Sequence, residues 1–173
     1  AEGGAAGRCE LPLLHTAGGL VGGDQLSIDL NLKAESRSLI TSVAAQKVYG
    51  SVGRSRLNPD GAWARQGVTC TMTDNTDLEW LPQEMVLYAD ALLHQSLRVC
   101  LPENASFLSA EIVRLGRTAA EERLNQGCWR SCLEIQRHGA DAPRWELVDR
   151  PELGGSSLTD SHGLAGAPVF GSL

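Results

Sequence analysis

A strict alternation of apolar and polar residues over residues 25–32 is the feature that most limits the folds open to this chain. In this segment, QLSIDLNL, every second residue from Leu26 to Leu32 is a leucine or an isoleucine, and polar residues stand between them. Successive side chains of a β-strand point to opposite sides, so a period of two places the apolar residues on one face. The segment therefore predicts a half-buried β-strand.

The same alternation returns further along the chain. It is regular in VTCTMT at residues 68–73, and it continues through ALLHQSLRVCL at residues 91–101 with one interruption at Gln95. Turn-forming sequences lie between such segments: NPDG at residues 58–61 predicts one hairpin, and HGAD at residues 138–141 predicts another.

Two short helices are also predicted. The first covers residues 109–116, which begin at a serine and end at a glycine. The second covers residues 118–127, where Thr118 and Glu121 have the spacing of a capping box. Together these patterns predict an all-β, mainly antiparallel, layered β-rich fold with one or two short helices, in a single domain over residues 1–173.

Composition excludes several classes of partner and points to one compartment. The formal net charge is -6 and the 15 lysines and arginines are scattered, which argues against nucleic-acid binding. No apolar run approaches the roughly 20 residues of a membrane span, and the N-terminus lacks the apolar core of a signal peptide. Five cysteines without a signal peptide fit reduced thiols. We therefore expect a cytoplasmic protein that contacts neither nucleic acid nor membrane.

The glycine-rich segment AGGLVGGD at residues 17–24 superficially resembles a phosphate-binding loop. A dinucleotide fingerprint needs glycines at positions i, i+2 and i+5 ahead of a helix, whereas a strand follows here. A P-loop needs Gly-Lys-Ser or Gly-Lys-Thr, and the first lysine is Lys33. The segment is therefore interpreted as a tight turn that needs positive φ or close packing, and Asp24 either caps that turn or meets a metal.

Catalytic signatures are weak throughout the chain. The four histidines do not have the spacing of a metal site, and no serine or cysteine stands in a nucleophile motif. Four carboxylates, however, lie beside apolar or glycine-rich stretches: Asp24, Glu79, Glu84 and Glu111. They are candidates for general acids or bases, for oxygen ligands of a divalent cation, or for structural hydrogen bonding.

Five segments taken in order resemble the UreD family of urease accessory proteins, called UreH in some organisms, and the cyanobacterial members most of all. They are PLLHTAGGLVGGDQL, ITSVAAQKVYGS, LEWLPQEMVLY, EIVRLGR and GLAGAPVFGSL. The resemblance implies a scaffold and metallochaperone, not an enzyme. Such a protein binds apo-urease and UreF, and UreF in turn recruits the GTPase UreG. The assembly is expected to deliver Ni²⁺ to urease. The resemblance also implies a β-rich layered fold with few helices, and a water-filled tunnel proposed as the nickel route.

The resemblance carries specific residues onto this chain. The family motifs fall on Gly18, Gly19, Gly22, Gly23 and Asp24, on Trp80, Leu81, Pro82, Gln83 and Glu84, and on Glu111, Gly116 and Arg117. It implies no tightly bound cofactor, only nickel in transit, for which Asp24, Glu79, Glu84 and Glu111 form the hypothetical path.

The family pattern also extends beyond this sequence. Family members carry further segments at each end, so the chain is expected to be truncated at both ends. Two alternatives remain: a β-sandwich or jelly-roll metal-dependent enzyme, and an interaction module that never contacts nickel.

Overall fold

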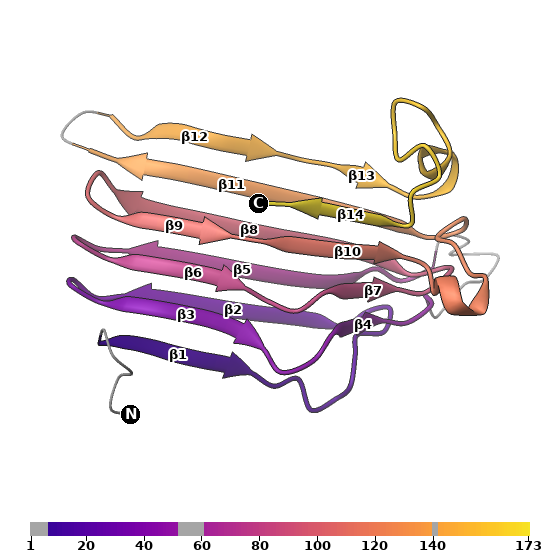
Figure 1. Ribbon diagram of the computed structural model, residues 1–173, viewed down its shortest axis with the longest axis horizontal. Coiled ribbons are helices and arrows are strands. Elements are labelled where there is room, and N and C mark those ends of the chain that lie inside the picture. Colours follow the sequence, from indigo (N-terminus) through magenta and orange to yellow (C-terminus); the bar gives the residue numbers. More distant parts are fainter. Residues whose placement is uncertain (1–6, 52–60, 140–141) are drawn as a thin grey trace.

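Strands form nearly all of the regular structure in the computed structural model, which describes residues 7–51, 61–139 and 142–173 (Figure 1). The strands are β1 (Arg8–Leu13), β2 (Gln25–Leu32), β3 (Arg37–Ser42), β4 (Gln46–Val48), β5 (Ala64–Met72), β6 (Asp77–Leu81), β7 (Met85–Leu87), β8 (Leu92–Pro102), β9 (Ser106–Ser109), β10 (Glu111–Leu115), β11 (Cys128–His138), β12 (Arg144–Asp149), β13 (Glu152–Leu153) and β14 (Val169–Ser172).

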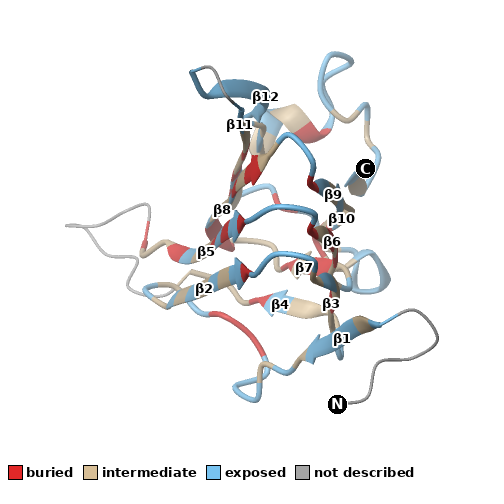
Figure 2. Ribbon diagram, turned by 90° about the vertical axis from the view of Figure 1, so that its left-hand side faces the viewer, coloured by how far each residue is buried: buried red, intermediate tan, exposed pale blue. Residues whose placement is uncertain are grey.

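The strands are stacked in coils of three. The chain passes through β2, β3 and β4, then repeats the circuit through β5, β6 and β7 and again through β8, β9 and β10. The first strands of each coil, with β11, β12 and β13, form a back sheet in the order β12-β11-β8-β5-β2. The others form two front sheets, β1-β3-β6-β9 and β14-β10-β7-β4 (Figures 1 and 2). Each coil thus closes around an interior between two layers.

This stacking makes most of the strand pairs parallel, and the expectation of a mainly antiparallel fold is wrong. Strands β2, β5, β8 and β11 pair in parallel along the back sheet, as do β3, β6 and β9 in front. Among the described residues only β11–β12, β11–β13 and β10–β14 pair antiparallel. The reason is topological: the chain completes a whole coil before it returns to a sheet, so each strand meets its predecessor in the same direction.

The predicted strands form, but only one of the two predicted hairpins does. The alternating segments became β2, β5 and β8, as expected, and β11 pairs with β12 as the predicted second hairpin, although residues 140–141 of its turn lie outside the described residues. The first predicted hairpin is wrong, because β4 pairs with β7 whereas β5 pairs with β2 and β8. The NPDG turn lies outside the described residues except for Gly61.

Neither predicted helix forms. Residues 109–116 contain β10, in which Val113 and Leu115 are buried and Glu111, Ile112 and Arg114 are less so. Residues 118–127 contain a single 3₁₀ turn, Thr118–Ala120, which ends at Glu121 in the left-handed conformation. The other 3₁₀ turn is Gly155–Leu158. None of the described residues forms a helix long and apolar enough to cross a membrane.

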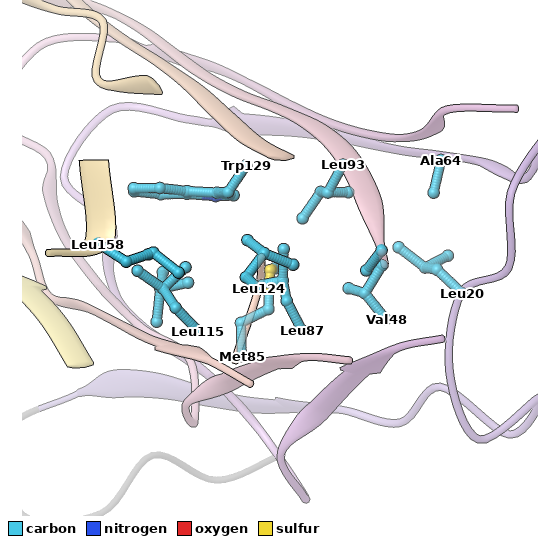
Figure 3. Packing of buried hydrophobic residues seen from close by; sticks show 12 residues of the cluster. Leu20, Val48, Ala64, Met85, Leu87, Leu93, Leu115, Leu124, Trp129 and Leu158 are labelled. Carbon is cyan, nitrogen blue, oxygen red and sulfur yellow. The ribbon is translucent and has the colours of Figure 1, made fainter. Parts of the chain in front are cut away.

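Two apolar clusters fill the interior among the residues that the structure describes. The Trp129 cluster consists of buried residues from β5, β8 and β11 of the back sheet, from β4, β7 and β10 of the front layer, and from segments between the strands. Figure 3 shows Trp129 and Leu93 facing Val48, Leu87 and Leu115. The Trp80 cluster fills the other end of the layers and consists of Leu32, Ile40, Val68, Cys70, Met72, Leu78, Trp80, Val99, Leu101 and Ala105. The two clusters share no residue, and a part of the interior lies between them.

Candidate functional site

A cavity of about 750 Å³ lies between the back and front sheets. Its lining includes His15 and Gln46 beside the first coil, and Asp149 and Ser172 on the strands at the opposite side of the stack. The cavity therefore extends along the direction in which the coils are stacked.

One row of the back sheet supplies polar side chains to this cavity. In the parallel register, Leu26 pairs with Gln66, Gln66 with Gln95, and Gln95 with Ser131. All four residues line the cavity. Two residues earlier along these strands, the next inward-facing row holds Leu93 and Trp129. Two residues later, the next inward-facing row holds apolar residues from β2, β5, β8 and β11. A polar belt is thus enclosed by apolar rows.

Glu111 faces this belt from the opposite layer. It is the first residue of β10 and shares its inward direction with Val113, since the side chains of a strand alternate. Its carboxylate accepts a hydrogen bond from Gln95 Nε2, and Gln95 Oε1 accepts one from Trp129 Nε1 at 3.3 Å. Side chains from β11, β8 and β10 therefore form a chain of hydrogen bonds that crosses the interior between the layers.

The surroundings of Glu111 change its acidity. Burial raises the pKa of the Glu111 carboxyl to about 6, the hydrogen bond from Gln95 opposes this increase, and the negative charge of Asp149 adds to it. A carboxyl group with this pKa changes its charge near neutral pH. Glu111 is thus a buried carboxylate that can exchange a proton inside the cavity.

The side of the cavity near the first coil is also polar. The His15 ring Nδ1 and the Gln46 side-chain Nε2 are 3.1 Å apart, and both residues line the cavity. At the other side, Asp149 on β12 contributes a second carboxylate. No group of three or more histidine, cysteine, aspartate or glutamate residues that could hold a metal ion occurs within residues 7–51, 61–139 and 142–173. The cavity therefore offers separate oxygen donors.

Asp24 caps the glycine-rich turn. Its carboxylate Oδ2 accepts a hydrogen bond from the backbone N–H of Val21 at 2.9 Å, and its own N–H donates to the Val21 carbonyl at 3.0 Å. Gly18, Gly19 and Gly23 all have positive φ, in agreement with the turn interpretation. Asp24 is not among the residues that line the cavity.

Glu79 and Glu84 lie outside the cavity lining as well. Glu79, on β6, accepts a hydrogen bond from Arg8 at 3.3 Å and borders a separate groove lined by residues of β1, β3, β6 and β9. Glu84 lies between β6 and β7, where its carbonyl accepts a hydrogen bond from the Gln46 backbone N–H at 2.9 Å. Of the four proposed carboxylates, Glu111 alone lines the cavity.

The second motif does reach the cavity. Trp80, Pro82 and Gln83 all line it, with Trp80 buried and Pro82 in the break between β6 and β7. The backbone N–H of Gln83 donates to Ser42 Oγ at 2.9 Å, which fixes this break against the end of β3. The motif therefore shapes one wall of the cavity.

The third motif organises the turn after β10. Gly116 has φ of 106°, and a Cβ added there would stand 2.4 Å from the carbonyl oxygen of Glu122. Arg117 pairs with Glu122, and its guanidinium carbon lies 4.3 Å from the centre of the Tyr88 ring. Hydrogen bonding from Arg117 lowers the pKa of the Glu122 carboxyl. These residues stabilise the turn and do not line the cavity.

Sequence reasoning missed the polar belt. Gln66, Gln95 and Ser131 carry no motif, and their alignment depends on the register between coils. One signal was available: Gln95 interrupts an otherwise apolar alternation, and a polar residue on an inward face needs a partner.

Comparison with known proteins gives one consistent result. The family described as "UreD urease accessory protein" matches residues 1–173. A relative named "Urease accessory protein UreD" from Parasynechococcus marenigrum (strain WH8102) is 78% identical over 173 residues, which cover 100% of this chain and 56% of the relative. Proteins of the same name are 69% identical in Synechococcus sp. (strain CC9605), covering 99% of this chain and 55% of the relative, and 60% identical in Prochlorococcus marinus (strain MIT 9303), covering 96% and 56%. The chain thus spans a little over half the length of these relatives.

Proposed function

Because the chain belongs to the UreD family of urease accessory proteins, we propose that it takes part in urease maturation as a scaffold without bond-making chemistry of its own. Nickel is then a cargo in transit and no tightly bound cofactor is needed. The observation that carries this proposal is the cavity along the stack of coils, with a carboxylate and amides placed between two apolar clusters.

Glu111 is the residue that we propose to contact Ni²⁺ inside the cavity. Its carboxylate is a hard oxygen donor, and Asp149 supplies a second one near one side. Oxygen donors bind nickel more weakly than thiolates or clustered imidazoles do, which suits a cation that must be released again. Asp24, Glu79 and Glu84, which lie outside the cavity lining, are proposed to act only before the cation enters or after it leaves.

The proposed partners are UreF, the GTPase UreG and apo-urease, in the cytoplasm, with no role for nucleic acid or membrane. One observation favours the alternative of an interaction module that is independent of nickel. Strand β12 is the edge of the back sheet and exposes Trp145, Leu147 and Val148. Exposed apolar residues of this kind are typical of protein interfaces.

Glu111→Gln tests the nickel proposal, because it keeps the size of the side chain and removes its charge. Nickel-dependent activation of apo-urease, measured with UreF and UreG present, should fall by about tenfold or more, since the loss of one charged ligand costs 1.4 kcal/mol or more. The complex with UreF should still be recovered in a pull-down.

Glu121→Gln is the matched control, because this carboxylate is exposed in the turn after β10, does not line the cavity and has no proposed role in the nickel route. Its activation should match that of the unmodified protein. Full activation of apo-urease by the Glu111→Gln variant would contradict a nickel path through the cavity. If Trp145→Ala then abolished the complex while Glu111→Gln did nothing, the interaction-module alternative would stand.

A further inference from the structure

The outer face of the back sheet carries three basic residues at one register. Arg65 pairs with His94 and His94 pairs with Arg130, so the three side chains lie side by side on β5, β8 and β11. The residues that follow them along these strands line the cavity, so the basic side chains point to the opposite side of the sheet. All three are exposed. Arg65, His94 and Arg130 form the basic row.

Arg65 differs from the other arginines that contact this face. Those arginines are all paired with glutamates: Arg98 and Arg150 with Glu134, and Arg130 with Glu152. Within the described part of the chain no carboxylate pairs with Arg65, and its Nη1 lies 3.3 Å from Nδ1 of His94. Arg65 therefore contacts a second basic group where its neighbours contact an acid.

The contact between Arg65 and His94 leaves hydrogen-bond donors on both residues. A guanidinium has five N–H donors and no acceptor, so His94 Nδ1 accepts the hydrogen bond from Arg65, and the proton of the neutral ring is then on Nε2. Four donors of Arg65 and the Nε2–H of His94 remain. A carboxylate, which has only acceptors, complements this set, and arginine can bind it through two parallel hydrogen bonds.

An aromatic side chain lies next to the basic row. The guanidinium carbon of Arg130 is 4.5 Å from the centre of the Trp63 ring, which precedes β5. Tryptophan and arginine are the residue types that most often dominate the binding energy of protein interfaces. The next row of this face consists of residues with small side chains, beside which a second polypeptide can approach the sheet: Ser27, Gly67, Ser96 and Cys132.

We infer that the basic row and Trp63 form a docking site for an acidic segment of a protein partner, which places one carboxylate on Arg65 and His94. The inference rests on the proposed role in urease maturation and adds the surface by which one partner is held. Nucleic acid fits this face less well, because its binding neutralises several phosphates. The chain has a formal net charge of -6, and the other described arginines of this face already have carboxylate partners.

Charge reversal at Arg65 tests the site in complexes with UreF, UreG and apo-urease, each followed by its dissociation constant. Arg65→Glu should weaken the binding of one partner by about tenfold or more, because a like charge then faces the carboxylate of that partner. Lys33→Glu is the matched control, since Lys33 is exposed after β2 and the change in net charge is the same. It should leave all three dissociation constants unchanged. Equal losses in both variants would overturn the inference.

A defined probe gives a second readout that a merely structural arginine would not move. The probe is a short synthetic peptide in which glutamate alternates with threonine, compared with the same peptide carrying lysine in place of glutamate. The indole N–H resonance of Trp63, assigned by its loss in Trp63→Phe, should shift with the acidic peptide only. In Arg65→Glu the basic peptide should cause the shift instead. No shift with the acidic peptide, or the same shift with a single-stranded oligonucleotide, would contradict the docking site.

The outcomes separate the docking site from the proposed function. If the unmodified protein binds its partners and Arg65→Glu binds them equally well, the docking site is wrong and the role in urease maturation stands. If the unmodified protein binds none of the three proteins while the acidic peptide shifts the Trp63 resonance, the role in maturation is wrong and the docking site stands.

Discussion

Gly18 and Gly19 are adjacent members of one motif, yet different physical requirements select them. Gly18 has φ of 78° with nothing within 4 Å of an added Cβ. Gly19 has φ of 156°, and its added Cβ would stand 2.6 Å from the Tyr49 ring and 2.8 Å from the Lys47 carbonyl oxygen. Gly18 is therefore needed for its backbone conformation, and Gly19 mainly because β4 and its following residue approach so closely.

This difference predicts unequal costs for alanine. Gly18→Ala should lower the free energy of unfolding by about 1 kcal/mol, the cost of a left-handed conformation. Gly19→Ala should lower it by about 2 to 4 kcal/mol, because overpacking against a backbone atom is added to the unfavourable φ. Urea denaturation of both variants measures the difference. Equal costs would show that close approach to β4 plays no part.

At this scale the sequence predicted the turn and missed its surroundings. A strand after the glycines excluded a phosphate loop, and the structure confirms a turn capped by Asp24. The contact partners of Gly19 could not be predicted, because Lys47 and Tyr49 reach it from the end of the coil. The contacts of Gln95 were hidden for the same reason: Trp129 is on the next back strand, β11, and Glu111 is on β10, at the end of the coil that begins with β8.

Individual strands are tied together on the outer face of the back sheet by Glu134. This residue of β11 accepts hydrogen bonds from Arg150 Nη2 at 2.7 Å and from Arg98 Nε, on β8, at 2.9 Å. Its side chain is only 8% exposed, whereas both arginines are more than half exposed. Hydrogen bonding from Arg150, and then from Arg98, lowers the pKa of Glu134 to about 2.

A lowered pKa in the folded chain has a definite consequence for pH dependence. The stabilisation by Glu134 is complete above the ordinary carboxyl pKa of 4.5 and is lost as the pH falls toward about 2. Glu134→Gln should lower the free energy of unfolding at neutral pH by about 1 kcal/mol, a discounted value because the arginines are exposed. Thermal melts between pH 2 and 7 should show a smaller pH dependence in the variant. Parallel curves would contradict this role.

At the level of elements, periodicity predicted strands well and their partners poorly. The alternation in β2, β5 and β8 reflects one face turned toward the interior, which is a local property. Parallel pairing is a property of the complete coil, so no local pattern of residues predicts it. Residues 111–115 were too short to distinguish a helix from a strand, and burial of Val113 and Leu115 against the Trp129 cluster decided in favour of the strand.

Among the described residues, two apolar clusters pack in the interior together with a cavity that one polar row lines. Leu93 belongs to the Trp129 cluster and Val99 to the Trp80 cluster, although both residues are on β8 and both are fully buried. Since no member is common to the two clusters, each should respond to substitution without affecting the other.

Additivity of two substitutions tests this separation. Leu93→Ala should lower the free energy of unfolding by about 2 to 5 kcal/mol and Val99→Ala by about 1 to 3 kcal/mol, through lost burial and the voids left behind. The double variant should equal the sum of the singles within about 0.5 kcal/mol. Urea denaturation of the four proteins measures the coupling. A coupling well above that value would mean that the two clusters behave as one core.

At this scale the family resemblance predicted more than the residue patterns did. Motifs spread from Leu13 to Leu173 indicated the family, and the matched family confirms it. The cavity could not be located from residue patterns, because it is produced where inward rows from successive coils change from apolar to polar.

The register of the polar row determines how single substitutions can change the lining of the interior. Each coil contributes one side chain to the row, and neighbouring strands are about 4.8 Å apart, so any solute moving along it meets a succession of single-residue steps. A substitution at one step alters that step and leaves the others in place. The polarity of the interior can therefore change at one coil at a time, by single substitutions that leave the pairing of the enclosing sheets unchanged.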